Sequence, residues 1–272
     1  MSVTMEGKRA TFAGINTHYY EEGQGVPVLF IHGSGPGVSA WANWRLVLPY
    51  FSKHFHVIAP DLAGFGSTEK LDEENYGMDV WVNQLSAMIE NKGLERVSIV
   101  GNSLGGAIAL HLAKRKPEWI HKIVLMGTVG VPFKLTEGLD KVWGYTPSYE
   151  NMAELIDIFS YDDKYANDSD LIELRYKQTL EKENQEAFES MFPAPRQVHV
   201  NKLALSEEEL REIKHPVLAL HGREDQVIPV ENSWKVFQSV TNVEIHLFSK
   251  CGHWIQIEKT DEFCKQVKLF LD

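Results

Sequence analysis

Six short apolar runs constrain the fold of this chain more than any other feature of its sequence. Each is nearly continuous in hydrophobic residues, as strands buried on both faces of a sheet are, and longer segments with helical periodicity separate them. This alternation predicts an α/β fold with a mostly parallel central sheet flanked by helices. The runs are VPVLFI (26–31), HVIAP (56–60), VSIV (97–100), IVLMG (123–127), PVLALHG (216–222) and VEIHLF (243–248).

The alternation stops between residues 130 and 200. This segment has little strand character, many charges and helical periodicity. We therefore expect a helical cap over 130–200, inserted into an α/β core that comprises residues 1–129 and 201–272.

Composition excludes several classes of function. The formal charge of −11 disfavours nucleic acid or an anionic membrane as the main partner. No stretch approaches the roughly 18 apolar residues needed to span a bilayer, and the first ten residues contain no apolar signal-peptide core. Two cysteines are too few for a disulfide framework, and no CxxC or HExxH spacing suggests a metal. We expect a cytoplasmic protein with no metal site.

The sequence GNSLGG (101–106) fits the G-x-S-x-G pattern of a nucleophile elbow. It follows the run ending at Val100 and precedes a helical pattern, which is the strand–turn–helix context that such an elbow requires. Ser103 is therefore the expected nucleophile, and the N–H of Leu104 lies where a helix begins and favours negative charge. The alternative is a serine that only caps a helix, which this context disfavours.

A serine hydroxyl needs a base, and the base needs an orienting acid. In enzymes with this elbow the acid and then the histidine follow the serine in the chain. Asp225 comes just after one buried run and His253 follows the next, so both are expected at the same edge of a parallel sheet.

Other residues compete for these roles. Glu224 adjoins Asp225 and is the alternative acid, although Asp225 is favoured by its place before the VIP turn. Asp61 precedes the serine and more plausibly holds its own glycine-rich loop. His221 is too close to Asp225 in the chain to be its partner, and we expect it to pack under that loop.

The glycine-rich turn HGSGPG (32–37) bares backbone N–H groups after the first apolar run. It shows neither the phosphate-loop pattern nor the dinucleotide fingerprint. With a serine nucleophile downstream, we expect the N–H groups of Ser34 and Leu104 to form an oxyanion hole for a tetrahedral intermediate.

Arg175 lies on an apolar helical face in DLIELRYKQTL (170–180). At 100° per residue, Leu171, Ile172 and Leu174 share its face, whereas charged residues take the other. An arginine among apolar residues either extends its charged end to solvent or meets an anion, and the helix alone does not decide between these readings. A guanidinium facing a cleft suits a carboxylate.

Beyond these inferences, the chain resembles the meta-cleavage product hydrolases of the α/β-hydrolase superfamily, and among them the 2-hydroxymuconic semialdehyde hydrolases. The segments that carry this resemblance are HGSGPGVSAWANW, GNSLGG, MFPAPRQ, HGREDQVIP and CGHWIQIE. The likeness extends over most of the chain and is weakest between Gly130 and about Asn167.

The resemblance implies roles for individual residues. Ser103, Asp225 and His253 correspond to the catalytic triad, and Ser34 and Leu104 to the oxyanion hole. The residues implied to line the substrate site are Gly33, Asn43, Asn102, Arg175 and Trp254, with the arginine holding the dienoate carboxylate.

The resemblance also implies a reaction. The substrate is a small anionic 2-hydroxy-6-oxo-hexa-2,4-dienoate with a hydrogen or a small alkyl group at C6, which is cleaved to 2-hydroxypenta-2,4-dienoate and a carboxylic acid without a cofactor. The sequence leaves the oligomeric state open, with a homo-oligomer, dimeric or larger, as one alternative. Two alternatives stay open, a carboxylesterase that needs the same triad and a ligand receptor built on a hydrolase scaffold. Haloalkane dehalogenases and epoxide hydrolases carry an aspartate where this chain has Ser103.

Overall fold

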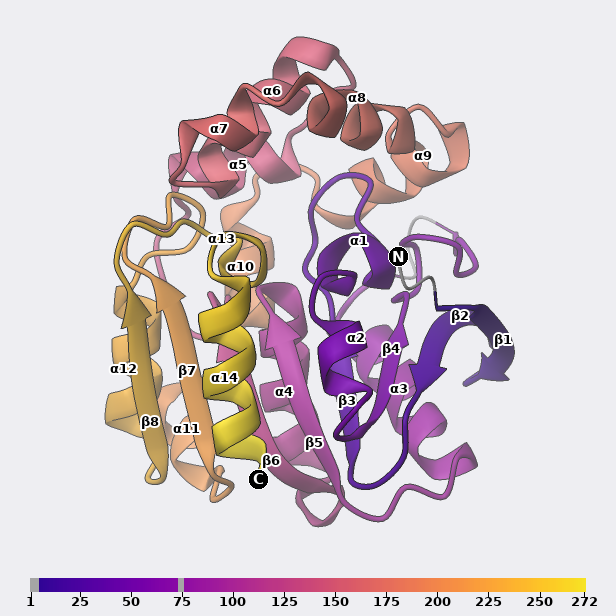
Figure 1. Ribbon diagram of the computed structural model, residues 1–272, viewed down its shortest axis with the longest axis vertical. Coiled ribbons are helices and arrows are strands. Elements are labelled where there is room, and N and C mark those ends of the chain that lie inside the picture. Colours follow the sequence, from indigo (N-terminus) through magenta and orange to yellow (C-terminus); the bar gives the residue numbers. More distant parts are fainter. Residues whose placement is uncertain (1–4, 73–75) are drawn as a thin grey trace.

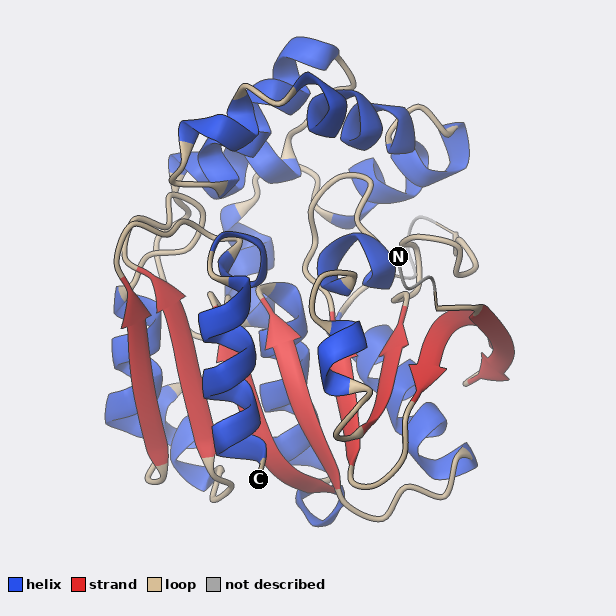
Figure 2. Ribbon diagram, in the orientation of Figure 1, coloured by secondary structure: helices blue, strands red, loops and turns tan. Residues whose placement is uncertain are grey.

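Eight strands form one sheet in the computed structural model, which describes residues 5–72 and 76–272 (Figures 1 and 2). The strand order is β1-β2-β4-β3-β5-β6-β7-β8, and the strands from β4 through β8 in this order pair in parallel. The parallel strands are β3 (Pro27–Ile31), β4 (His56–Pro60), β5 (Val97–Asn102), β6 (Ile120–Met126), β7 (Val217–Gly222) and β8 (Val243–Phe248). All six predicted strands are thus confirmed, and so is the mostly parallel α/β sheet.

Two further strands were not predicted from the sequence. β1 (Gly7–Phe12) and β2 (Ile15–Glu22) form an antiparallel hairpin, and β2 then pairs antiparallel with β4. β2 alternates between buried and more exposed positions, and β1 is mostly exposed. A half-solvated edge of this kind carries many polar side chains, so it does not form a continuous apolar run.

Helices cover both faces of the sheet, which explains why its strands are apolar on both sides (Figure 2). Alternate residues of β3 illustrate this: Leu29 and Ile31 belong to one hydrophobic core, and Val28 and Phe30 to the other. One core includes side chains from α3 (Met78–Asn91), α4 (Leu104–Arg115) and α12 (Glu231–Ser239). The other includes side chains from α1 (Ala40–Trp44), α2 (Leu48–Phe51) and α14 (Thr260–Leu271).

A helical insertion follows β6 in the chain and ends before residue 205. Figure 1 shows α5 to α9 gathered beyond the carboxyl ends of the parallel strands. At the base of this segment, the N–H of Leu205 donates to the carbonyl of Gly130 over 3.1 Å, so the outgoing and returning chains lie side by side. The helices are α5 (Glu137–Trp143), α6 (Tyr149–Phe159), α7 (Asp163–Ala166), α8 (Ser169–Gln178), α9 (Lys182–Met191) and α10 (Gln197–Leu203).

The remaining short elements complete the core. They are η2 (Pro117–Trp119), α11 (Glu207–Glu212) and α13 (Ile255–Glu258). None of the helices within 5–72 and 76–272 combines the length and apolar character that crossing a bilayer requires.

Candidate active site

Ser103 lies in a strained turn between β5 and α4. Its backbone has φ 51° and ψ −110°, a region that residues with a side chain rarely adopt, and its side chain makes no hydrogen bond to the helix that follows. The turn is tight because a Cβ on Gly105 would lie 2.2 Å from the carbonyl oxygen of Ile31. The helix-capping alternative is therefore wrong, and the geometry is that of a nucleophile elbow.

Asp225 and His253 form a buried hydrogen-bonded pair. The Nδ1 of His253 lies 2.7 Å from Oδ2 of Asp225, in the loops that follow β8 and β7. The other carboxylate oxygen accepts the backbone N–H groups of Val227 and Ile228 over 2.8 and 2.9 Å. Burial by itself would raise the pKa of Asp225, but a positive charge on His253 and hydrogen bonds from the neighbouring histidines outweigh it and hold this pKa well below its ordinary value.

The structure also separates Asp225 from its competitors. Glu224 accepts the backbone N–H of Cys251 over 3.1 Å and so braces the loop that carries His253. His221 is fully buried beneath Asp225, where its Nδ1 lies 2.7 Å from Oγ of Ser233 and its Nε2 is 3.3 Å from the Asp225 carboxylate. Both findings agree with the sequence prediction.

Asp61 holds its glycine-rich loop, as expected. Its carboxylate accepts the backbone N–H of Ala40, over 2.6 Å, and that of Ser67, over 2.9 Å. His18 contacts the same carboxylate over 2.9 Å. These contacts tie the loop after β4 to the start of α1.

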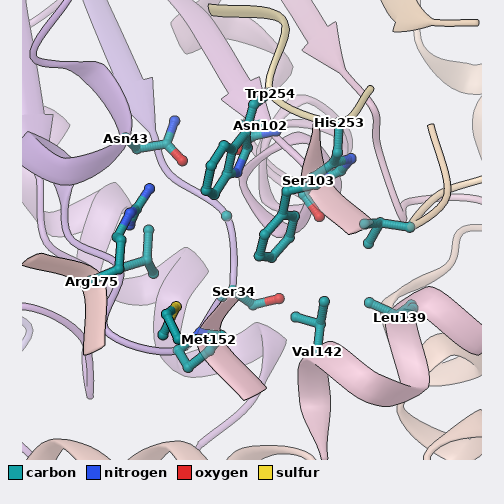
Figure 3. A pocket seen from close by; sticks show the side chains of 16 residues that line it. Ser34, Asn43, Asn102, Ser103, Leu139, Val142, Met152, Arg175, His253 and Trp254 are labelled. Carbon is teal, nitrogen blue, oxygen red and sulfur yellow. The ribbon is translucent and has the colours of Figure 1, made fainter. Parts of the chain in front are cut away.

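Ser103 and His253 line one pocket, and Figure 3 shows them next to each other. Among the residues that the structure describes, no hydrogen bond joins the Ser103 hydroxyl to the imidazole ring of His253. Hydrogen bonds of this kind are often long without substrate and shorten when it binds. Ser103 follows β5 and His253 comes after β8, so both lie at the carboxyl edge of the sheet, which is where the sequence analysis expected them.

The glycine-rich turn presses against the elbow. A Cβ on Gly33 would lie 3.1 Å from Oδ1 of Asn102 and 3.3 Å from Cβ of Ser103. His32 fixes the orientation of the turn: its Nε2 accepts the N–H of Leu62, so its Nδ1 carries the proton and donates to the carbonyl of Gly33 over 2.7 Å.

The Gly33 carbonyl and the Ser34 N–H belong to one trans peptide, so they point in opposite directions and the N–H faces away from His32. Neither this N–H nor that of Leu104 donates to another group in the described residues. Ser34 lines the pocket, whereas the side chain of Leu104 packs into the core behind the serine.

Arg175 lies at the other end of the pocket with no acidic partner. Its side chain is only 7% exposed, and no carboxylate of the described chain lies within 4.0 Å of its guanidinium. Burial, together with the nearby charge of Arg45, lowers the pKa of Arg175 to about 10. The guanidinium carbon lies 4.9 Å from the centre of the Trp254 ring, a cation–π contact.

One prediction for this helix is wrong. Leu174 is 54% exposed, so it does not share a face with Arg175. The buried face of α8 is centred on Ile172, Arg175 and, one turn further, Thr179, and Leu174 lies more than 90° from that direction.

The other predicted binding residues also line this pocket. Asn43 is buried, and the described residues provide no hydrogen-bond partner for its side-chain NH2 group. Asn102 donates to the carbonyl of Met126 over 3.3 Å. Trp254 stacks on Phe159 with ring centres 4.8 Å apart.

Sequence reasoning missed the apolar wall contributed by α5 and α6. Phe159 is the most informative of these residues, because its carbonyl accepts the N–H groups of His253 and Trp254 over 2.8 and 3.2 Å. Its position after Met152, Leu155 and Ile156 continues a helical apolar face, a signal that could have identified it. The missed residues are Leu139, Val142, Met152 and Phe159.

Within the described ranges, no group of three or more His, Cys, Asp or Glu residues is placed to hold a metal ion.

Comparisons with known proteins agree with this geometry. The family model described as the alpha/beta hydrolase fold matches residues 26–260. The chain is 49% identical to a 2-hydroxy-6-oxo-2,4-heptadienoate hydrolase of Pseudomonas putida (strain F1), covering 97% of this chain and 96% of that relative. It is 47% identical to a 2-hydroxymuconate semialdehyde hydrolase of Pseudomonas sp. (strain CF600), covering 97% and 93%.

Solved structures give the same result. A meta-cleavage product hydrolase from Pseudomonas fluorescens IP01, crystallised as a serine-to-alanine mutant with acetates, superposes with a TM-score of 0.95 at 46% identity and 97% coverage of both chains. A hydrolase of 2-hydroxy-6-oxo-6-phenylhexa-2,4-dienoate from Rhodococcus sp. strain RHA1 gives a TM-score of 0.90 at 29% identity, with 98% and 99% coverage.

Proposed function

Because this chain belongs to the α/β-hydrolase fold family and, within it, to the meta-cleavage product hydrolases, we propose that it cleaves 2-hydroxymuconic semialdehyde or its small 6-alkyl analogues. It is a C–C bond hydrolase of the meta-cleavage degradation of aromatic compounds. The products of the proposed reaction are 2-hydroxypenta-2,4-dienoate and a carboxylic acid, which is formate when the C6 substituent is hydrogen.

One observation carries the choice of substrate. Arg175 is a buried cation with no carboxylate beside it among residues 5–72 and 76–272, and it lines the same pocket as Ser103. A substrate carboxylate compensates this charge and places the far end of a short chain near the serine. A simple ester needs no such partner, so the arginine favours a dienoate over a neutral ester.

The reaction begins with ketonisation, in which the 2-hydroxy dienoate becomes a keto acid through proton transfer to C5. This step makes the later departure of carbon feasible, because the electrons of the C5–C6 bond then move through the C3–C4 double bond onto the oxygen of the C2 ketone and give a conjugated dienolate. In our proposal Arg175 holds the carboxylate throughout. We also assign to Asn43 a bond to the polar end of the same substrate, since its NH2 group has no partner among the residues that the structure describes.

Cleavage follows the logic of a serine hydrolase. His253 removes the proton of Ser103, whose oxygen adds to the C6 carbonyl, and Asp225 holds the ring and stabilises its positive charge. The N–H groups of Ser34 and Leu104 bind the oxyanion. The C5–C6 bond then breaks, and the dienolate takes the proton from His253 at its C2 oxygen to give the 2-hydroxypentadienoate. His253, again neutral, then activates the water that releases the acid from Ser103.

Three broader expectations belong to the same proposal. Residues 130–200 form a cap over the site, consistent with the pocket contacts of Arg175 and Phe159. A homo-oligomer, dimeric or larger, stays open as an alternative to a monomer. The location is cytoplasmic, in keeping with two buried free cysteines.

Ser103→Ala tests the proposal. Hydrolysis of the dienoate should be abolished, whereas the yellow dienolate should still bind, because Arg175 is separate from the nucleophile. Absorbance of the dienolate measures both. Turnover near that of the wild type would remove Ser103 from its role, and a strong preference of the wild type for p-nitrophenyl acetate over the dienoate would favour a carboxylesterase.

A further inference from the structure

Trp143, the last residue of α5, makes a hydrogen bond to the predicted oxyanion-hole residue. Its indole Nε1 donates to Oγ of Ser34 over 2.9 Å, in a buried contact between residues 109 positions apart. Trp143 is 2% exposed and is not among the residues that line the pocket, whereas Ser34 is. The indole therefore contacts the back of Ser34 and does not reach a substrate in front of it.

Aromatic packing fixes the direction of this N–H. The indole stacks on Phe192 with ring centres 4.2 Å apart and an interplanar angle of 4°, and the ring of His199 meets it edge-on. Phe192 in turn lies 6.4 Å from Trp81, on α3 of the core. The indole is thus held between segments of the helical insertion and the core, and rotation away from Ser34 would break a well-formed stack.

The hydrogen bond also determines where the Ser34 hydroxyl proton points. An indole N–H only donates, so Oγ of Ser34 must accept from it, and the hydroxyl proton has to point elsewhere. In the part of the chain that the structure describes, the hydroxyl donates no hydrogen bond, and its only bond is the one it accepts from Trp143. Figure 3 shows the Ser34 oxygen directed toward the space between Ser103 and Val142.

We propose that Trp143 is a positioning residue: its N–H orients the Ser34 hydroxyl so that this hydroxyl donates to the negative charge that develops on the substrate oxygen beside Ser103. Ser34 then supplies two donors, its backbone N–H and its hydroxyl. This inference rests on the proposed function for the location of the charge, and it adds a donor that acts only when the indole holds the hydroxyl in place.

Trp143→Phe tests this role, because phenylalanine preserves an aromatic ring against Phe192 and removes the N–H. We expect kcat to fall by about 5- to 10-fold, the worth of one neutral hydrogen bond, while KM changes less than about twofold. The matched control is Trp234→Phe, the same chemical change at a 42% exposed position of α12, which should leave kcat unchanged. An unchanged kcat for Trp143→Phe, or a loss confined to KM, would overturn the proposal.

A double-mutant cycle shows whether Trp143 acts through Ser34. Ser34→Ala should lower kcat by at least as much as Trp143→Phe, and combining the two should cause no further loss. Losses that multiply in the double mutant would show that Trp143 acts elsewhere. If Trp143→Phe does not fold, replacement of Trp143 by the isosteric benzothienylalanine, which has sulfur in place of the N–H, gives the same comparison in a nearly unchanged shape.

The cycle should be measured on the dienoate and on p-nitrophenyl acetate, since both develop charge on an oxygen beside Ser103. If the wild type cleaves only the ester, and the double mutant loses no more kcat than the single mutants, the proposed function is wrong and the role of Trp143 stands. If the wild type cleaves the dienoate, and the kcat loss of the double mutant is the product of the two single losses on both substrates, the role of Trp143 is wrong and the function stands.

Discussion

Replacing Arg175 by methionine should make the unliganded protein more stable and a worse dienoate hydrolase. Burial lowers the pKa of Arg175 from 12.5 to about 10, and a tenfold change in an equilibrium corresponds to about 1.4 kcal/mol. The buried charge of Arg175 therefore lowers the free energy of unfolding by about 3 kcal/mol. Loss of the cation–π contact with Trp254, worth about 0.5–2 kcal/mol, offsets part of the gain. We expect a net rise of about 1–2.5 kcal/mol in the free energy of unfolding.

The sign follows from the direction of the pKa change. A base whose pKa is lower in the folded state is disfavoured in its charged form, and at neutral pH Arg175 is charged in both states. The whole cost is then present, and it declines only as the pH rises above about 10. Urea denaturation of Arg175→Met and the wild type at pH 7, without substrate, measures the difference.

Activity should change in the opposite direction. Truncating one partner of a buried charge pair costs about 2–5 kcal/mol, so kcat/KM for the dienoate should fall by roughly 30-fold to several thousandfold. Hydrolysis of neutral p-nitrophenyl acetate should change little. Lys177→Met is the matched control, because Lys177 lies on the same helix but faces solvent in an exposed ion pair with Glu173. A less stable Arg175→Met protein, or equal losses on the two substrates, would refute the reasoning.

Three other substitutions probe the site. Asp225→Asn should lower kcat by about 10⁴-fold, because the amide cannot hold His253 in the required tautomer. Glu224→Gln should keep a kcat within a fewfold of the wild type, because the partner of Glu224 is the backbone of Cys251. Steady-state kinetics on the dienoate measures both variants, and similar losses would show that the acid is misassigned. Because the pKa of Asp225 is lowered in the folded state, its charge stabilises the fold at pH values above its ordinary pKa near 4, and this contribution is lost as the pH falls toward the folded-state pKa. The difference in Tm between the wild type and Asp225→Asn should therefore become smaller from pH 6 to pH 3. A constant difference would exclude this linkage. Gly105→Ala should destabilise the protein by about 1–3 kcal/mol or more, since its Cβ would meet the carbonyl of Ile31; an unchanged urea midpoint would contradict the tightness of the elbow.

The parallel sheet and the residues at its carboxyl edge could be predicted because their signals are local. A strand buried on both faces is apolar throughout, and the turn at Ser103 needs small neighbours such as Gly105. The placements of Asp225 and His253 then followed from the rule that parallel strands end at one edge. The β1–β2 hairpin escaped prediction because a half-solvated strand with many polar residues has no continuous apolar run.

Contacts between the helical insertion and the core could not be predicted. The hydrogen bond from Trp143 to Ser34 joins residues 109 positions apart, and nothing in either neighbourhood indicates the other. Arg175 was placed on a buried face, but the apolar periodicity around it misplaced Leu174, because burial on α8 depends on what the helix packs against. Whether a buried cation meets an anion or solvent is decided by that same packing.

The hydrogen bond between Leu205 and Gly130 has a consequence for how proteins of this architecture diversify. Because the two ends of the helical insertion are adjacent, the insertion is attached to the sheet as one long loop whose ends meet. An insertion of different length or helix number needs only ends that span the same short distance between its attachment points. The entropy lost on closing a loop increases only slowly with loop length. The catalytic edge can thus be retained while the surface that faces the substrate is exchanged as a unit.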